Sequence, residues 1–194
     1  MFNLPVSEKP EINMHFEKSV ITYNNIIDFN TAQRLINYAY SEKSGLHTRG
    51  SNYPKICDAS FKTCLINDTN DLIYNQLNDI WMKFIELSKP NITFIEPYEI
   101  KIYSKGDKFN YHHDGYGSVF SDVDRKINLV IQLSDENDYK GGELYVGPYL
   151  CSKKFGSAIF FPSHYIHKIS EITSGTRISL IGHAWGPTVR GWSG

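Results

Sequence analysis

The spacing of apolar residues along the chain changes near residue 90. Before that point the spacing is helical, and a first helix is predicted to begin at Asn30, whose side chain suits the capping position. Gly45 follows as a stop signal. The apolar residues that share one face of this predicted helix are Ala32, Leu35, Ile36 and Ala39.

A second helix is predicted from about Asp68 to Lys89, because Pro90 prevents its continuation. One face of it carries Ile73, Leu77, Ile80, Trp81 and Phe84. The intervening residues 46–67 are expected to form a loop with one or two short strands.

From residue 91 onward the chain consists of short β-type runs separated by turn residues. The runs are ITFIEPYEIKIYS (92–104), KINLVIQLS (126–134), GELYVG (142–147), SAIFFP (157–162), HKISEI (167–172) and TRISLIGHAW (176–185). Many short strands of this kind predict a β-sandwich or barrel, and the two helices would cover one sheet face. We therefore expect a mainly β fold with flanking helices, in one domain spanning residues 1–194. Residues 1–90 would form a helical support region and residues 91–186 the β core.

The alternation of side chains within these runs leaves one polar face open to two interpretations. In the run 126–134 the odd-numbered residues are apolar, whereas the even-numbered ones include Asn128 and Gln132. In the segment 99–103 two isoleucines oppose Glu99, Lys101 and Tyr103. The polar face either meets water or lines a cavity inside a double-sheet barrel.

The composition excludes several classes of protein. Among 194 residues, 41% are hydrophobic and 21% charged, so a packed core is expected rather than wholesale disorder. Twenty basic against 21 acidic residues give a net charge of −1, which argues against a nucleic-acid or membrane-surface binder. No apolar run approaches the roughly 20 residues of a membrane span, and a secretory signal is not seen. The three cysteines, Cys57, Cys64 and Cys151, cannot all pair within one chain, so we expect a reducing, cytoplasmic location.

Two histidines and an aspartate are spaced as metal ligands. His112 and Asp114 are two residues apart, so on an extended strand they would point to the same side. His167 follows where a new strand is predicted to begin. Two histidines and one carboxylate form a facial triad that leaves positions open on Fe(II). Ten residues later Arg177 offers a guanidinium suited to binding a carboxylate.

Each of these pieces alone is weak, because a His-x-Asp pair or a strand arginine is common on protein surfaces. Their order is more informative: Tyr-x-x-Gly-x-x-Phe-x-x-His-x-Asp (103–114), Gly-Gly-Glu-Leu (141–144), Phe-Pro-Ser-x-x-x-His (161–167) and Gly-x-Arg-x-Ser-Leu (175–180). Over roughly residues 98–185 the sequence resembles the prolyl 4-hydroxylase-like branch of the 2-oxoglutarate- and Fe(II)-dependent dioxygenases.

The resemblance implies a double-stranded β-helix, a relative of the jelly roll and the cupins. His112, Asp114 and His167 would be the iron ligands, and no further catalytic residue is implied. Arg177 would bind the distal carboxylate of 2-oxoglutarate, and Tyr103 would hydrogen-bond the same co-substrate. The reaction implied is hydroxylation of an unactivated C–H bond, with O2 consumed and succinate and CO2 released. Ascorbate is a further candidate cofactor.

The other histidines of the region receive separate interpretations. Strand alternation points His113 away from the ligands, and His164 has the wrong parity to accompany His167. His183 shares the face of Arg177, with a pocket role and a structural role both open. The segment 142–144 matches a structural strand of the family. Asn128 stands where many relatives have threonine, so its contact with the co-substrate stays open.

The residues after Asp114 are expected to form a substrate lid or binding loop from Gly115 to Asp124. The resemblance favours a prolyl, peptidyl, protein or small-molecule substrate. Two alternatives stay open: an oxygenase of nucleic-acid bases, which the neutral charge disfavours, and a cupin-like metal-binding protein without oxygenase activity. Oligomeric state is not readable from the sequence.

Overall fold

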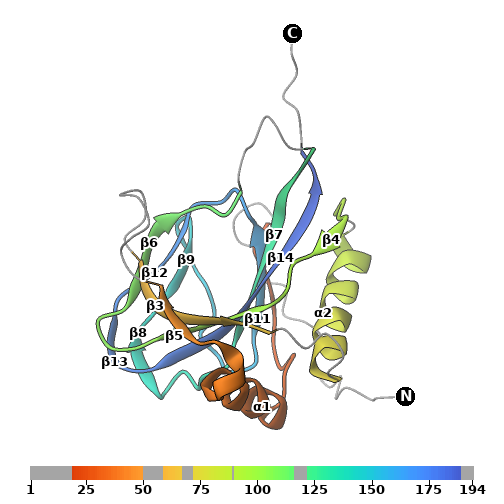
Figure 1. Cartoon of the computed structure of the whole chain (residues 1–194). Coiled ribbons are helices and arrows are strands. Elements are labelled where there is room, and N and C mark those ends of the chain that lie inside the picture. Colours follow the sequence, from red (N-terminus) through yellow and green to blue (C-terminus); the bar gives the residue numbers. More distant parts are fainter. Residues whose placement is uncertain (1–18, 50–58, 67–71, 89, 116–121, 189–194) are drawn as a thin grey trace.

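Two antiparallel sheets that curl over one another form the body of the protein (Figure 1). The computed structural model describes residues 19–49, 59–66, 72–88, 90–115 and 122–188, without the side chains of Arg49, Leu72 and Ile73. The major sheet has the order β1 (Ile21–Tyr23), β11 (Ala158–Pro162), β7 (Val123–Gln132), β14 (Arg177–Pro187), β5 (Glu99–Tyr103) and β3 (Ala59–Leu65). At its margins β2 (His47–Arg49) pairs with β3, and β4 (Phe94–Ile95) pairs with β14.

The minor sheet consists of β6 (Lys108–His112), β12 (His167–Ile169), β9 (Leu144–Val146) and β10 (Tyr149–Leu150). Strand β3 joins the two sheets, because it pairs with β5 through residues 62–65 and with β6 through residues 59–60. A separate ladder pairs β8 (Tyr139–Gly141) with β13 (Ile172–Gly175). From β5 onward the chain passes repeatedly between the two sheets, which is the topology of a double-stranded β-helix. The predicted fold class is therefore confirmed.

Both long helices lie on the outer side of the major sheet, away from the minor sheet (Figure 1). Helix α1 (Phe29–Tyr40) is followed by the short 3-10 helix η1 (Glu42–Ser44). Helix α2 (Leu72–Ser88) ends two residues before Pro90. Neither helix, within the residues described, is long and apolar enough to cross a membrane.

One detail of the first helix differs from the expectation. Asp28, not Asn30, is the capping residue, and its carboxylate accepts a hydrogen bond of 2.7 Å from the backbone N–H of Thr31. The anionic oxygen lies at the positive end of the helix dipole and satisfies a backbone donor, whereas Asn30, two residues later, is already inside the helix. The predicted start of the second helix, at Asp68, lies outside the described residues.

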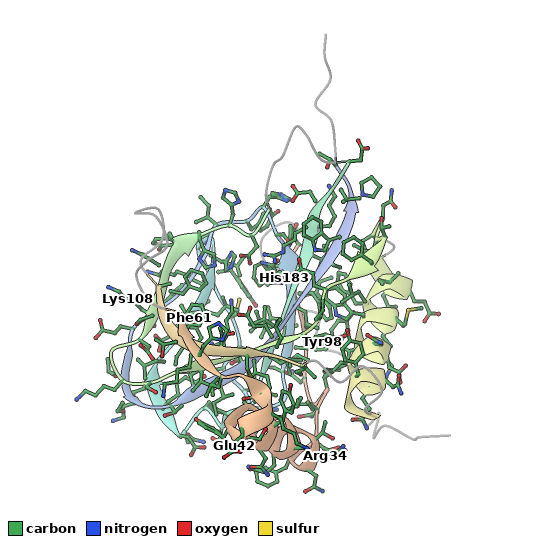
Figure 2. The ribbon with its side chains drawn as sticks, in the orientation of Figure 1. Arg34, Glu42, Phe61, Tyr98, Lys108 and His183 are labelled. Carbon is green, nitrogen blue, oxygen red and sulfur yellow. The ribbon has the colours of Figure 1, made fainter. Side chains whose placement is uncertain are left out.

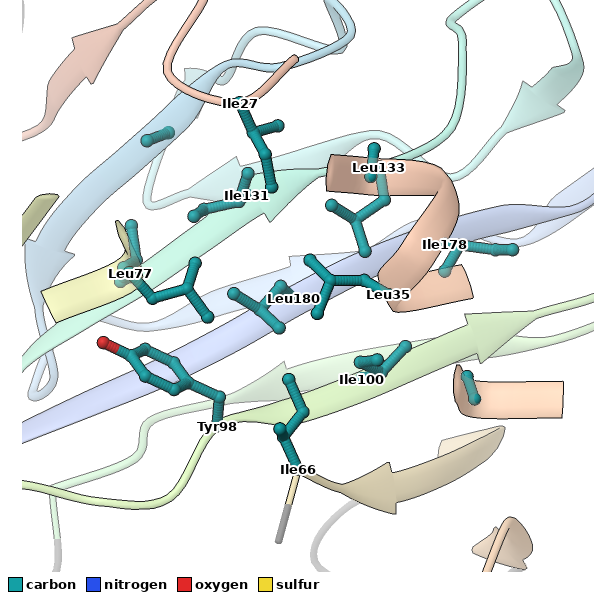
Figure 3. Close-up of a cluster of buried hydrophobic side chains, with 14 of the residues drawn as sticks. Ile27, Leu35, Ile66, Leu77, Tyr98, Ile100, Ile131, Leu133, Ile178 and Leu180 are labelled. Atoms are coloured by element: carbon teal, nitrogen blue, oxygen red, sulfur yellow. The ribbon is translucent and has the colours of Figure 1, made fainter. Parts of the chain in front are cut away.

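The first hydrophobic core joins the helices to the major sheet. Leu35 of α1 and Leu77 of α2 pack with Ile100, Ile131 and Leu180 from three neighbouring strands (Figure 3). The odd-numbered apolar residues of β7 thus face the helices, as their alternation predicted. The even-numbered residues face a second apolar cluster between the two sheets. The polar face therefore lines the interior of the barrel rather than the solvent.

Candidate metal centre

His112 and His167 face one another because their strands pair in register. They are directly opposite partners on the antiparallel strands β6 and β12, so their side chains share the inner face of the minor sheet. The centres of their rings are 4.1 Å apart. Phe109 stacks on His112 with a centroid distance of 3.6 Å, and Phe161 meets His167 edge-on at 4.9 Å. Packing therefore fixes both imidazole rings.

Asp114 also lies beside the two histidines, but it is not on the same strand as His112, as their spacing had suggested. Strand β6 ends at His112, so Asp114 is not a strand residue. Its backbone N–H donates to the carbonyl of Ser163 at 2.9 Å, and that of Gly115 donates to the same oxygen at 3.1 Å. These two bonds anchor the chain just beyond β6 to the turn that precedes β12.

The three side chains place one oxygen and two nitrogens within 4.8 Å of one another. The His112 Nε2 lies 3.8 Å from Asp114 Oδ1, and the His167 Nε2 lies 3.2 Å from Asp114 Oδ2. Each imidazole uses Nδ1 for a backbone carbonyl two residues earlier, that of Asn110 at 2.7 Å and that of Tyr165 at 2.9 Å. When Nδ1 is the donor and the ring is neutral, Nε2 carries a lone pair toward the cluster, as a metal ligand requires.

A short chain of hydrogen bonds orients the Asp114 carboxylate. The amide of Asn128 donates to Asp114 Oδ2 at 2.7 Å, and the Ser163 hydroxyl donates to the Asn128 carbonyl oxygen at 2.6 Å. Asn128 and Ser163 are both buried. An ionised carboxylate only accepts hydrogen bonds, so Asn128 turns its N–H group toward Asp114, and its oxygen then accepts from the Ser163 hydroxyl.

His183 connects the carboxylate to a second polar group. It lies in the interior of the barrel (Figure 2), with Nε2 3.5 Å from Asp114 Oδ2 and Nδ1 3.2 Å from Glu96 Oε2. Glu96 accepts two hydrogen bonds from Arg125, at 3.0 and 2.8 Å, and one from the Trp185 indole at 2.6 Å. Burial by itself raises the pKa of Glu96, but the bonds to His183 and Arg125 outweigh it and lower the pKa to about 2.

The protonation of the cluster suits a cation. Burial alone would raise the pKa of Asp114, but hydrogen bonds and positive charge from His167 and His183 hold it well below its usual value. Burial, and then the nearby His167, lower the pKa of His112 to about 3. Near neutral pH the aspartate is thus anionic and His112 is neutral, which are the forms that bind a metal ion. The donor set of two imidazoles and one carboxylate fits Fe(II).

The triad opens into a hollow between the two sheets, with Arg177 in its wall. Arg177 is directly opposite Tyr103 in the register of β14 and β5, and its guanidinium carbon lies 5.4 Å from the centre of the Tyr103 ring. Burial raises the pKa of Tyr103, so its hydroxyl keeps its proton. The sequence-predicted residues are thus brought to one cavity.

The guanidinium of Arg177 is buried, with 1% of its surface exposed, and incompletely paired. Its Nη1 donates to the Ser179 hydroxyl at 3.1 Å, whereas Nε and Nη2 have no hydrogen-bond partner among the described residues. Within that part of the chain, no carboxylate forms an ion pair with it. A buried cation with two unused donors costs several kcal/mol, and an anion bound in the cavity would offset that cost.

The Gly-Gly-Glu-Leu segment shapes the wall beneath Arg177. Gly142 has a left-handed backbone with φ of +68°, and a Cβ there would lie 2.4 Å from the Ile172 side chain and 3.0 Å from Arg177 Cδ. Only glycine satisfies both requirements. Leu144 is buried in the second apolar cluster. The structural role expected for this segment agrees with its surroundings.

The remaining predicted residues fall as follows. His113 and His164 are exposed, so neither joins the cluster. Most of the expected lid, residues 116–121, lies outside the described residues. Three contributors were not singled out as site residues: Glu96, Ser163 and Lys101. Ser163 lies in a motif and Lys101 on the polar face of its strand, so both had a sequence signal, whereas nothing in the sequence marked Glu96.

The fold and the site together define a class of protein. Its members are double-stranded β-helices that carry two histidines and one carboxylate at the edge of the cavity. Residues 98–185 match the family model described as the 2OG-Fe(II) oxygenase superfamily. Over this segment, which is just under half of the chain, the sequence is similar to that superfamily.

Curated relatives match up to about half of the chain. A PKHD-type hydroxylase of Idiomarina loihiensis is 30% identical over 87 residues, which are 43% of this chain and 39% of the relative. A second, from Cupriavidus pinatubonensis, is 31% identical over 105 residues, or 50% of this chain and 45% of the relative. The matched segment thus spans less than half the length of these relatives.

Solved structures show the same fold over more of the chain. The viral collagen prolyl hydroxylase of Paramecium bursaria chlorella virus 1 superposes with a TM-score of 0.70 and 17% identity, covering 97% of this chain and 99% of the other. A prolyl 4-hydroxylase of Pseudomonas putida gives a TM-score of 0.65 and 14% identity, with 87% and 92% coverage.

Proposed function

We propose that the protein is an Fe(II)- and 2-oxoglutarate-dependent dioxygenase that hydroxylates an unactivated C–H bond of a prolyl, peptidyl or amino-acid substrate. One O2 and one 2-oxoglutarate would be consumed per turnover, giving the hydroxylated product, succinate and CO2. The observation that carries the proposal is the buried, unpaired guanidinium of Arg177 in the same cavity as the triad. A metal-binding protein without oxygenase activity has no use for that second, anion-binding group.

Each residue has a distinct role in this proposal. His112, Asp114 and His167 would hold Fe(II), which when bound supplies the activation of O2 coupled to decarboxylation of the co-substrate. Arg177 would bind the distal carboxylate of 2-oxoglutarate through its two unused donors, and the protonated Tyr103 hydroxyl would donate to the same group. These hydrogen bonds would orient the co-substrate in a cavity whose apolar walls limit the entry of water.

The roles of the surrounding polar groups follow from their contacts. The Ser163–Asn128 chain holds the Asp114 carboxylate in one orientation, with an N–H group on Oδ2. A fixed carboxylate favours one coordination geometry over others and raises the affinity for the metal. Asn128 therefore has a role toward the metal ligand, and the proposal assigns it none toward the co-substrate.

The substrate class is inferred from the names of the relatives. Matched structures include a collagen prolyl hydroxylase and a prolyl hydroxylase in complex with a peptide. Peptides that contain proline are therefore the first substrates to test. The whole chain would act as one domain, in a reducing compartment where Cys64 and Cys151 stay free. Ascorbate would serve as an accessory reductant. The chain's neutral balance of charge gives no support to a nucleic-acid substrate.

The test is succinate release from purified protein supplied with Fe(II), 2-oxoglutarate, ascorbate and pools of proline-containing peptides. His112→Ala should abolish turnover, whereas His113→Ala, at the neighbouring exposed histidine, should keep the wild-type rate. Equal turnover in the wild type and His112→Ala, or no turnover with any pool and no binding of 2-oxoglutarate, would overturn the assignment.

A further inference from the structure

The cavity contains a second cationic side chain that the proposed mechanism does not use. Lys101 lies on β5 two residues before Tyr103, on the same inner face, and contributes to the cavity wall. It is 8% exposed. Its ammonium nitrogen lies 5.0 Å from the centre of the Phe61 ring and 5.2 Å from that of Phe109. The charge is therefore held among aromatic rings rather than in solvent.

The ion pair that Lys101 makes is a loose one. Its ammonium lies 3.6 Å from Glu99 Oε2, which is longer than a hydrogen bond, and Glu99 also accepts a hydrogen bond from the Thr63 hydroxyl. Among the described residues no hydrogen bond of Lys101 to a side-chain acceptor is seen. An ammonium group has three donors, so Lys101 can donate to a further acceptor inside the cavity.

Lys101 lies between the guanidinium and the metal ligands. It is the cross-strand partner of Ser179, whose hydroxyl accepts the bond from Arg177. On the other side its ammonium faces Phe109, the ring that stacks on His112. Lys101 thus lines the cavity next to the Arg177–Ser179 pair on one side and to the ring that stacks on His112 on the other.

We propose that Lys101 is a second anion-binding residue of the cavity and that its ammonium binds a carboxylate lying next to the metal cluster. The inference rests on the proposed function and adds to it that the site accommodates two carboxylates. Such a carboxylate has two sources, the 2-oxo acid end of the co-substrate or an acid group of the substrate. The alternative is that Lys101 only stabilises the fold through Glu99 and the two phenylalanines.

The experiment compares Lys101→Met, which removes the charge and keeps an apolar stem, with Lys101→Arg, which keeps the charge. Lys105→Met, in the exposed turn after β5, controls for loss of a positive charge. The double variant Lys101→Met/Glu99→Gln serves if the single change leaves Glu99 unpaired and unfolds the protein. Circular dichroism and Mn(II) affinity establish that each variant is folded and loaded.

The first arm measures, by calorimetry on the Mn(II)-loaded protein, the affinity for 2-oxoglutarate and for 2-oxobutanoate, which lacks the distal carboxylate. If the co-substrate is the source, Lys101→Met weakens both ligands by roughly tenfold or more, as expected for loss of a charge-assisted hydrogen bond, and Lys101→Arg largely restores them. Arg177→Met would weaken only 2-oxoglutarate.

The second arm probes a substrate acid group with acetate, whose methyl protons relax faster when acetate lies near Mn(II). With 2-oxoglutarate saturating, wild type and Lys105→Met should show this relaxation, and Lys101→Met should lose most of it if the acid group belongs to the substrate. A Lys101→Met protein that matches Lys105→Met in both arms overturns the proposal. If 2-oxoglutarate binds neither wild type nor control, the proposed function fails instead, and acetate binding to the Mn(II) protein still tests Lys101.

Discussion

Replacing Arg177 by methionine should raise the thermal stability of the ligand-free protein and lower its affinity for 2-oxoglutarate. The guanidinium is 1% exposed and makes one hydrogen bond, to Ser179, while Nε and Nη2 have no partner among the described residues. Each unsatisfied buried donor costs about 1–3 kcal/mol, and replacing a buried charge by an apolar side chain of similar length stabilises by about 1–4 kcal/mol. For a chain of this size, each kcal/mol corresponds to about 2–4 °C in melting temperature.

The same change removes the one guanidinium found among the described residues that line the cavity. Losing one partner of a buried charge pair costs about 2–5 kcal/mol, so the dissociation constant for 2-oxoglutarate should rise by a factor between about 30 and about 4,000. Thermal denaturation without ligand and calorimetry on the Mn(II)-loaded protein measure the two effects. Arg125→Met is the matched contrast. Arg125 already forms an ion pair with the Glu96 carboxylate, so its replacement should lower the melting temperature.

Two results would refute this reasoning. One is an Arg177→Met protein that melts well below the wild type without ligand, which would mean that the guanidinium is satisfied in the free protein. The other is an unchanged affinity for 2-oxoglutarate, which would remove the anion-binding role of Arg177. Affinity for Mn(II) should not change, since Arg177 does not contact the triad.

Three further changes test the surroundings of the site. Asn128→Leu removes the hydrogen bond to the carboxylate ligand and should weaken Mn(II) binding by about 10–100-fold, and an unchanged Mn(II) titration would show that the bond does not matter. The pKa of Glu96 is lowered to about 2, so its ionised form stabilises the fold above about pH 4.5, and this stabilisation is lost as the pH falls toward about 2. The lowered pKa corresponds to about 3 kcal/mol. The free energy of urea unfolding of Glu96→Gln should therefore be lower than that of the wild type at pH 7 and equal to it near pH 2. Gly142→Ala should destabilise by more than Gly106→Ala, since both glycines have positive φ but only the first has a neighbour within 2.4 Å; equal losses of urea midpoint would show that backbone strain alone decides.

The sequence predicts the fold well where its pattern is periodic. The alternation of β7 and the apolar faces of the two helices assign residues to the correct core, because burial of those residues is what selects the fold. Boundaries were less accurate. Asn30 was taken as the helix cap although Asp28 also suits that position, and the choice between them depends on which backbone N–H each side chain reaches.

The site is predictable where strand pairing brings residues together. His112 with His167, and Tyr103 with Arg177, are direct cross-strand partners, so correct strands are enough to place them. Glu96 is different. It directly follows β4, which pairs with β14, and its backbone N–H donates to the His183 carbonyl at 2.9 Å. Because β4 has only two residues, its apolar pattern is too short to predict this pairing from the sequence.

Strand β3 has a consequence for any attempt to isolate residues 98–185. It lies before residue 90, yet it covers the backbone edges of both β5 and β6 and brings Phe61 against Tyr103 and Phe109. A fragment cut at residue 98 would present two uncovered strand edges, and such edges recruit other chains into intermolecular sheets. We therefore expect the segment that carries the candidate metal ligands to depend on an earlier stretch of the chain to remain monodisperse.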